Sequence, residues 1–192
     1  MKLILGSKSP NRKKVLEDLG FEFEVMDPNI DEKAIRFEDP VQLVKALAVA
    51  KAEALLSKIT EPSILITTDL VVAYGNEIRE KPESPEQARQ FLQDLAGDVP
   101  IRTVAALCVT NTQTGFQECE ADICEIEFEP LPDELINKFV EEGTFMNNAG
   151  GWAIQHPDIR SHARFMRGEI ESIIGLPKTL LLKLLKNAGY NE

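Results

Sequence analysis

The stretch LILGSKSPNRKKVLEDLG, Leu3–Gly20, predicts a buried strand, a tight loop and a helix in immediate succession. The apolar run Lys2–Leu5 is typical of a short buried strand. Ser9 suits the N-cap of a helix, Pro10 suits its first position, and the glycine at the end of the stretch suits its stop. The order of these signals predicts a strand-to-helix turn of the kind found in α/β proteins.

The same stretch is a candidate phosphate site. Where a strand leads into a helix, free backbone N–H groups and the positive end of the helix dipole converge. Ser7 and Ser9 add hydroxyl groups, and Arg12 can hold two phosphate oxygens at once. The loop is not a Walker loop, because the GxxxxGK[ST] pattern is absent. The alternative is that Ser9 only caps the helix and that the basic residues face water.

Charge and composition bound the class of protein. The 192 residues are 43% hydrophobic, which suits one domain, or two small lobes, with a packed core. The formal net charge of −11 argues against broad binding of nucleic acid. Since no apolar run approaches the ~20 residues of a membrane span and no signal-peptide pattern is seen, we expect a cytoplasmic protein that does not bind membranes.

The cysteines and histidines give no metal signature. Cys108, Cys119 and Cys124 are expected to be reduced thiols, because their number is odd and no secretory signal accompanies them. Their spacing does not match a zinc site. His156 and His162 lack an HExxH context, so no metal role is expected for either.

The remaining pattern predicts an α/β fold with a mixed sheet. Apolar residues at helical spacing predict helices at 41–57, from the capping box at Ser84 to Ala96, at 132–142, and at 176–189. Strands are predicted at 21–25, within 63–78 before and after a turn at Gly75-Asn76, in a long hairpin turning near 111–115, and at GEIESIIG, 168–175. The apolar stripe of the last helix is expected in the core. The alternative is a homodimer contact.

Asp69 interrupts the buried strand ILITTDLVVAY. Aspartate is depleted in strands and costly to bury without a partner. Because ligands of α/β proteins sit at strand ends, Asp69 is a candidate metal ligand or general base. The alternative is a strand-end aspartate in solvent.

Four more polar residues become candidates if the fold brings them to the same cleft. Glu32 follows Asp31 in an acidic loop, and two carboxylates from separate segments can hold one Mg²⁺ beside a polyphosphate. Lys51 lies late in an alanine-rich helix, and Lys81 precedes a capped helix. Gln155 lies in a glycine-rich loop, where small residues let a ligand approach. Each is otherwise an ordinary surface residue.

Several fragments occur in the order and spacing of the Maf family, which the chain resembles from Leu3 to about Pro177: LILGSKSPNRKKVLEDLG, IDEK, ALAVAKAEA, ITTDLVV, EKPESPEQARQFLQDLAG, NNAGGWAIQ and IIGLP. The resemblance implies one Maf-like domain over residues 1–192. Its fold would be an elongated mixed central sheet with flanking helices and two lobes around a central cleft, as in inosine-triphosphate pyrophosphatases. It also implies hydrolysis of a nucleoside triphosphate to the monophosphate and pyrophosphate with Mg²⁺ or Mn²⁺. The family is further linked to septum formation and cell-division arrest.

Carried onto this chain, the resemblance implies a role for each matching residue. Substrate binding falls to Ser7, Ser9, Arg12, Lys13 and Gln155. The catalytic set is Asp69, Lys51 and Lys81, and the metal ligands are Glu32 and Asp69.

The chain departs from the family pattern at Asn11, Thr68, Leu70, Asn147, Asn148, His156 and Pro157. Asn11 replaces one arginine and Asn148 replaces a lysine, so fewer positive charges surround the phosphates. Two alternatives stay open. One is a nucleotide-binding regulatory module with weak or no turnover. The other is a pyrophosphatase for a modified nucleotide, in which Trp152 stacks on the base and His156 reshapes the pocket.

Overall fold

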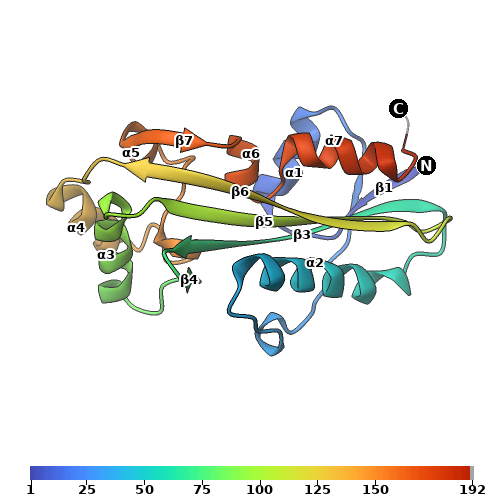
Figure 1. The fold of residues 1–192 in the computed structure, drawn as a ribbon, viewed down its shortest axis with the longest axis horizontal. Coiled ribbons are helices and arrows are strands. Elements are labelled where there is room, and N and C mark those ends of the chain that lie inside the picture. Colours follow the sequence, from blue (N-terminus) through green and yellow to red (C-terminus); the bar gives the residue numbers. More distant parts are fainter. Residues whose placement is uncertain (191–192) are drawn as a thin grey trace. The chain divides into compact units, whose positions relative to one another are not determined.

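The computed structural model describes residues 1–190, which form two compact units, each described by itself (Figure 1). Unit 1 comprises residues 1–70, 104–122 and 169–190, and unit 2 comprises residues 71–103 and 123–168. The expected single two-lobed domain over residues 1–192 stays a prediction, and its last two residues lie outside the described part of the chain. None of the helices within residues 1–190 has the length and apolar character that a membrane crossing requires.

The elements of unit 1 are two short strands, four helices, one 3₁₀ turn and the unit 1 portions of three long strands. They are β1 (Lys2–Leu5), α1 (Pro10–Asp18), β2 (Glu24–Val25), η1 (Glu32–Ala34), α2 (Pro40–Leu56), β3 (Ser63–Tyr74), β5 (Ile101–Asn111), β6 (Gln117–Phe128), α6 (Ile170–Ile173) and α7 (Lys178–Asn187). The strands β3, β5 and β6 continue into unit 2.

The central sheet is mixed, as the sequence predicts. Its strand order is β2-β1-β3-β5-β6-β7, and β4 (Glu77–Arg79) also pairs with β3. The strand β1 runs parallel to both β2 and β3, whereas β3 with β4, and β6 with β7 (Ala163–Arg167), are antiparallel.

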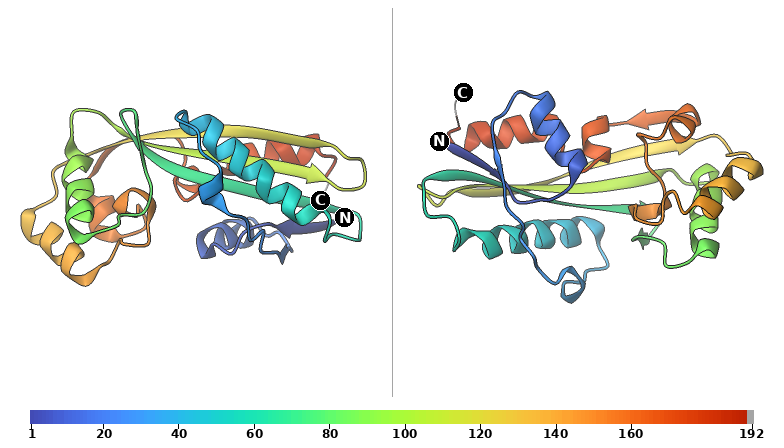
Figure 2. Two further views of the ribbon diagram at one scale, coloured as in Figure 1. Left: turned by 90° about the horizontal axis from the view of Figure 1, so that it is seen from below. Right: turned by 180° about the vertical axis from the view of Figure 1, so that it is seen from behind.

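Helices cover both faces of the sheet in unit 1, with α1 and α7 on one face and α2 on the other (Figures 1 and 2). Alternation along β3 explains this, because Ile64 and Ile66 join the core cluster with α1 and α7. The side chain of Thr67 points to the opposite face and donates to the carbonyl of Ala48 in α2 at 2.7 Å. The apolar stripe of the last helix is therefore core, since Leu181 and Leu184 are fully buried.

Unit 2 holds β4, β7 and the remaining helices and turns. These are α3 (Pro85–Gln93), η2 (Asp94–Ala96), α4 (Asp133–Glu142), η3 (Ala149–Gly151) and α5 (Pro157–Ser161). The predicted cap is present, since Ser84 Oγ accepts from the N–H of Gln87 at 3.2 Å, although Gln87 Oε1 accepts from the N–H of Glu83, at 2.7 Å, in place of that of Ser84.

Three local predictions differ from the structure. The segment GEIESIIG is the short helix α6, because its isoleucines at 170, 173 and 174 follow helical rather than alternating spacing. The predicted strand 21–25 shortens to Glu24–Val25. The strand β7 and the helix α5 were not predicted, since β7 is almost wholly exposed and α5 has only five residues.

Candidate active site

The loop after β1 lies directly beside β3. The pairing of β1 with β3 ends at Leu5 and Ile66, and the N–H of Gly6 donates to the carbonyl of Ile66 at 2.7 Å. A Cβ on Gly6 would lie 2.6 Å from the Thr67 methyl group and 2.8 Å from Leu55, so only glycine permits this approach. Because β3 continues past the end of β1, the loop sits against Thr67, Thr68 and Asp69.

The loop serves as a cradle for the guanidinium of Arg12. Ser7 is buried, and its Oγ accepts from the N–H of Ser9 and from Arg12 Nη1, both at 3.2 Å. Arg12 Nη1 also donates to the carbonyl of Thr68 at 3.3 Å. Burial lowers the pKa of Arg12, and the charges of Asp69 and Glu32 offset part of that effect. The buried Arg12 Nε has no hydrogen-bond partner within residues 1–190, so a donor remains for a ligand.

Thr68 and Gly175 complete this cradle. The hydroxyl of Thr68 donates to the carbonyl of Gly175 at 2.8 Å. Gly175 has φ +91°, and a Cβ there would lie 3.0 Å from Arg12 Nε and 3.1 Å from Nη2. The sequence marked Thr68 only as a departure from the family pattern. Thr68 could have been recognised as a site residue, because it is a polar residue next to Asp69 in an otherwise apolar strand.

Lys51 joins the two predicted metal ligands. Its Nζ lies 2.5 Å from Asp69 Oδ1 and 2.7 Å from Glu32 Oε1. The side chains of Lys51 and Asp69 are only 7% and 10% exposed, whereas that of Glu32 is 56% exposed. Lys51 lies in α2 and Glu32 in η1, so the three side chains meet only through the fold. Lys51 is therefore a buried bridge between carboxylates and not a surface lysine.

The environment of Asp69 shifts its pKa above the ordinary value of an aspartate. Burial raises the pKa of Asp69, and the ammonium of Lys51 and the guanidinium of Arg12 offset part of the rise. A carboxylate with a raised pKa is a stronger base than an ordinary aspartate, which suits the abstraction of a proton from water.

Glu32 and Asp69 fit a divalent cation. Their oxygens converge on the single Lys51 Nζ, and carboxylate oxygens suit Mg²⁺ and Mn²⁺. Within residues 1–190 no cluster of three or more His, Cys, Asp or Glu side chains forms a metal cage. One or two carboxylates suffice for Mg²⁺ when waters and substrate phosphates complete its shell.

Ser9 and Lys13 lie at the edge of this cluster. Ser9 is the N-cap residue of α1, as predicted, but its side chain makes no capping hydrogen bond, and its own N–H donates to Ser7 Oγ. Lys13 is half-buried in α1 and forms no ion pair with another of residues 1–190.

Lys81 and Gln155 belong to unit 2, where both side chains are exposed. Their segments are tied together, since the N–H of Gly150 donates to the carbonyl of Glu80 at 3.0 Å. This bond links the chain just before Lys81 to the glycine-rich turn that leads to Gln155. Their part in the site stays a prediction.

Arg79 anchors the segment that carries Lys81. Its Nη2 lies 2.6 Å from Asp94 and 3.0 Å from Glu77. Its guanidinium also lies over the rings of Tyr74 and Phe91, 4.3 and 4.6 Å from their centroids. The end of β4 is thereby held against α3.

Trp152 is not available to stack on a base. It is only 4% exposed, and its ring packs edge-on against Phe128 at 5.3 Å between centroids. His156 likewise packs edge-on against Phe139 and Phe145. Both residues build unit 2, so the stacking alternative loses its proposed platform.

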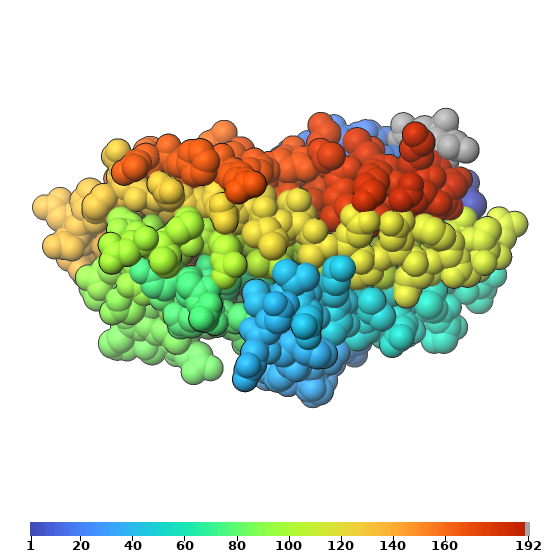
Figure 3. Space-filling view, in the orientation of Figure 1, coloured from blue at the N-terminus to red at the C-terminus, as the bar shows by residue number. Residues whose placement is uncertain are grey.

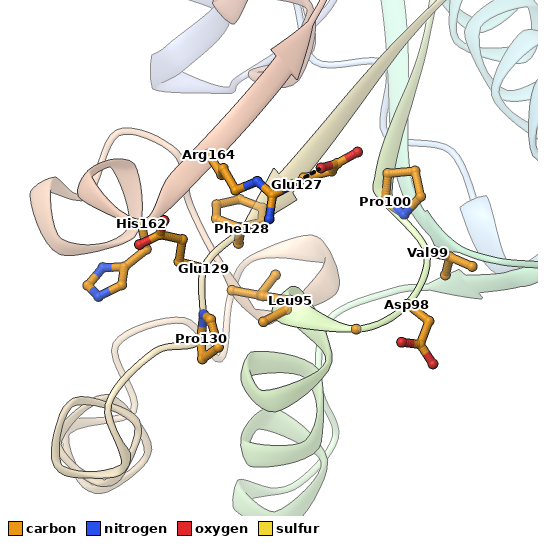
Figure 4. A pocket seen from close by; sticks show the side chains of 12 residues that line it. Leu95, Asp98, Val99, Pro100, Glu127, Phe128, Glu129, Pro130, His162 and Arg164 are labelled. Atoms are coloured by element: carbon orange, nitrogen blue, oxygen red, sulfur yellow. Dashed lines mark ion pairs between the residues drawn. The ribbon is translucent and has the colours of Figure 1, made fainter.

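A cavity of about 580 Å³ lies elsewhere in unit 2 (Figure 4). Its walls include Asp98, Phe128 and His162, and an ion pair between Glu127 and Arg164 at 3.8 Å. Of residues 1–190, those lining the cavity include no predicted site residue.

The glycine–serine loop after β1, the buried Arg12 and the two carboxylates that Lys51 bridges thus all belong to unit 1 of this α/β fold. Comparison with known proteins gives the family. The family described as Maf-like protein matches residues 2–188, and the chain belongs to this family.

Relatives with named activities extend over almost the whole chain. It is 41% identical to a 7-methyl-GTP pyrophosphatase of Dictyostelium discoideum, over 97% of each chain. It is 35% identical to a dTTP/UTP pyrophosphatase of Clostridium perfringens, again over 97% of each. A 7-methyl-GTP pyrophosphatase of Idiomarina loihiensis is 34% identical, over 98% of this chain and 96% of the relative.

A solved HAM1 protein from Coxiella burnetii is 15% identical, with a TM-score of 0.44, over 69% of this chain and 75% of that protein.

Proposed function

We propose that this protein hydrolyses a nucleoside triphosphate to the nucleoside monophosphate and pyrophosphate with the help of a divalent cation. The relatives named as nucleotide pyrophosphatases support the reaction class. The observation that carries the proposal is the bridge from Lys51 to Asp69 and Glu32 beside the Arg12 cradle. It supports the proposal because a buried carboxylate, a second carboxylate and two buried cations belong to one unit.

The phosphates would bind at the start of α1. There the backbone N–H groups, Ser7 Oγ and the unpartnered Nε of Arg12 are the available donors. Ser9 and Lys13 would add polar contacts at the rim. We further propose that Lys81 and Gln155 contact the same substrate from unit 2, the two units being the lobes of one domain.

The chemical step requires one proton acceptor and stabilisation of charge. A water molecule attacks the α-phosphorus, the bond from that phosphorus to the bridging oxygen of pyrophosphate breaks, and Asp69 takes the proton of the water. Lys51 holds Asp69 in place, and the positive charges of Lys51 and Arg12 stabilise the oxygens that gain charge. Glu32 and Asp69 would hold Mg²⁺ or Mn²⁺, which supplies further positive charge to the phosphates when bound.

The test is pyrophosphate release by purified protein with Mg²⁺ or Mn²⁺ and a panel of 7-methyl-GTP, dTTP, UTP and the common nucleotides. We expect metal-dependent release from at least one of them, and a loss of about 10²-fold or more in Asp69→Asn. Binding without release would instead support a regulatory nucleotide-binding module. The asparagines at 11, 147 and 148 favour that second candidate, because Asn11 and Asn148 stand where the family pattern has positively charged residues.

A further inference from the structure

Cys108 of β5 and Cys119 of β6 face each other across an antiparallel strand pair. The register follows from two hydrogen bonds near the hairpin turn. The N–H of Asn111 donates to the carbonyl of Phe116 at 2.8 Å, and Gln117 Nε2 donates to Thr110 Oγ1 at 2.9 Å. Counting back along both strands from these pairs places Cys108 opposite Cys119.

The pair occupies the position at which antiparallel strands come closest. Hydrogen-bonded and non-hydrogen-bonded pairs alternate, so the bonded pair of Asn111 and Phe116 makes Cys108 and Cys119 a non-hydrogen-bonded pair. The Cα atoms of such a pair are about 4.5 Å apart, which lies within the range of about 4.4–6.8 Å that a disulfide spans. Both cysteines are free thiols, and each affects the pKa of the other.

The two sulfur atoms differ in access. Cys108 is fully buried, whereas Cys119 is half-exposed at the sheet edge that β6 forms in unit 1. In the space-filling view this edge lies open between α2 and α7 (Figure 3). Cys119 points to the α2 side, with its Sγ 4.0 Å from the carbonyl of Lys45.

The residues on either side of Cys119 confirm that orientation. Glu120 accepts from Lys183 of α7 at 2.7 Å, and Glu118 accepts from Asn187 of α7 at 2.9 Å. Because successive side chains of a strand point to opposite faces, Cys119 lies on the face away from α7.

The thiols also differ in acidity. The hydrogen bond from Cys108 and the charge of Lys45 lower the pKa of Cys119, against the opposing effect of burial. The same hydrogen bond, followed by burial, raises the pKa of Cys108. A more exposed and more acidic thiol paired with a buried one suits an attacking and a resolving cysteine.

We propose that Cys108 and Cys119 form a reversible thiol–disulfide site, oxidised by a low-molecular-weight disulfide such as glutathione disulfide. The Cys119 thiolate attacks one sulfur of glutathione disulfide, forming a mixed disulfide and releasing one glutathione thiolate. Cys108 then attacks the Cys119 sulfur, its proton leaves with the second glutathione, and a Cys108–Cys119 bond forms. The two protein thiols are oxidised and one glutathione disulfide is reduced to two thiols. This site is independent of the proposed nucleotide hydrolysis.

The test is to incubate the native protein with glutathione disulfide, alkylate it after unfolding, and map the thiols by mass spectrometry. We expect one alkylated cysteine, Cys124, and a peptide pair joined through Cys108 and Cys119. Dithiothreitol should restore three alkylated cysteines. Cys124 is buried in unit 2, so Cys124→Ser is the matched control and should leave the disulfide unchanged.

Variants of the pair separate the two steps. Cys108→Ser should stop at a stable glutathione adduct on Cys119, and Cys119→Ser should give neither adduct nor disulfide. Three free thiols in the treated wild type, a persistent adduct on Cys119 in the wild type, or a disulfide that includes Cys124 would each overturn the proposal.

Discussion

Thr68 joins two segments that the sequence keeps more than a hundred residues apart. Its hydroxyl binds the carbonyl of Gly175, and its own carbonyl accepts from Arg12. Because Thr68 is fully buried, its hydroxyl and the Gly175 carbonyl cannot form hydrogen bonds with water in place of this one. Thr68 is one of the positions at which the chain departs from the family pattern.

We expect Thr68→Val to lower the free energy of unfolding by about 1–2 kcal/mol, because it leaves the buried Gly175 carbonyl without a donor. It should also raise KM for the nucleotide, since the Arg12 cradle loosens. Chemical denaturation and steady-state kinetics measure the two effects, and Thr68→Ser should restore both.

The matched control is Thr103→Val in unit 2. Thr103 is buried as well, but its hydroxyl has no partner within residues 1–190, so its removal should cost no stability. Equal losses in the two valine variants would show that the bond to Gly175 contributes nothing.

The raised pKa of Asp69 predicts where kcat/KM falls on the acid side of its pH profile, which we call the acid limb. Its ionised form is the base, so kcat/KM should fall as pH drops through a pKa above the ordinary aspartate value. The measurement is kcat/KM against pH. In Glu32→Gln the limb of the residual activity should move slightly to lower pH, because the Glu32 charge contributes to the rise. A limb at or below about pH 4 would remove Asp69 from the role of base.

The helix α2 carries the charged side chain of Lys51, which is buried within unit 1. Asp39 caps the N-terminus of α2 by accepting from the N–H of Gln42 at 2.7 Å. The apolar stripe of α2 packs on the sheet. That packing leaves Lys51 with the carboxylates of Asp69 and Glu32 as its ion-pair partners. The helix is thus a structural element and a source of one site residue.

We expect Lys51→Met to destabilise the protein by about 3–5 kcal/mol at neutral pH, because Asp69 is left as an unpaired buried charge. Loss of the ammonium raises the pKa of Asp69 further, so the folded state binds more protons than the unfolded chain. The unfolding free energy of the variant should therefore rise as pH falls through that pKa toward about 3.9, the unfolded value.

Urea denaturation across this pH range is the measurement. Lys45→Met removes a charge from the same helix without touching Asp69, so it should keep the pH dependence of the wild type, whereas that of Lys51→Met should be steeper. If the unfolding free energy of Lys51→Met ran parallel to that of the wild type at every pH, the proposed ion pair between Lys51 and Asp69 would be contradicted.

The residues predicted for the site belong to both units. Unit 1 holds the Arg12 cradle and the Lys51 bridge, and unit 2 holds Lys81 and Gln155. If both units act on one substrate, a change in unit 2 must alter binding of the nucleotide without altering the cluster in unit 1.

We expect Lys81→Ala to raise KM about tenfold, the value of one moderate phosphate contact, and to leave the unfolding midpoint unchanged because Lys81 is exposed. Lys138→Ala is the matched control, since Lys138 is also an exposed lysine of unit 2. Unchanged KM in Lys81→Ala would make Lys81 a surface residue.

Local patterns in the sequence predicted most elements correctly and drew attention to the buried Asp69. The strand–glycine–serine–helix order placed β1 and α1, and Asp69 stood out because a charged residue interrupts an apolar strand. These features depend on neighbours within a few positions, where helical and strand periodicities act. The segment of α6 was predicted as a strand although its isoleucines have helical spacing, because a run of only four residues gives a weak periodic signal.

The sequence by itself determined the mixed α/β class, the order of the elements and the family to which the chain belongs. Only the tertiary structure decided which polar residues meet. Lys51 reads as a surface lysine of an alanine-rich helix, Thr68 as a variant strand residue, and Trp152 as a base-stacking candidate. Their roles depend on contacts with Glu32, Gly175 and Phe128, which lie far along the chain and come together only when the sheet forms.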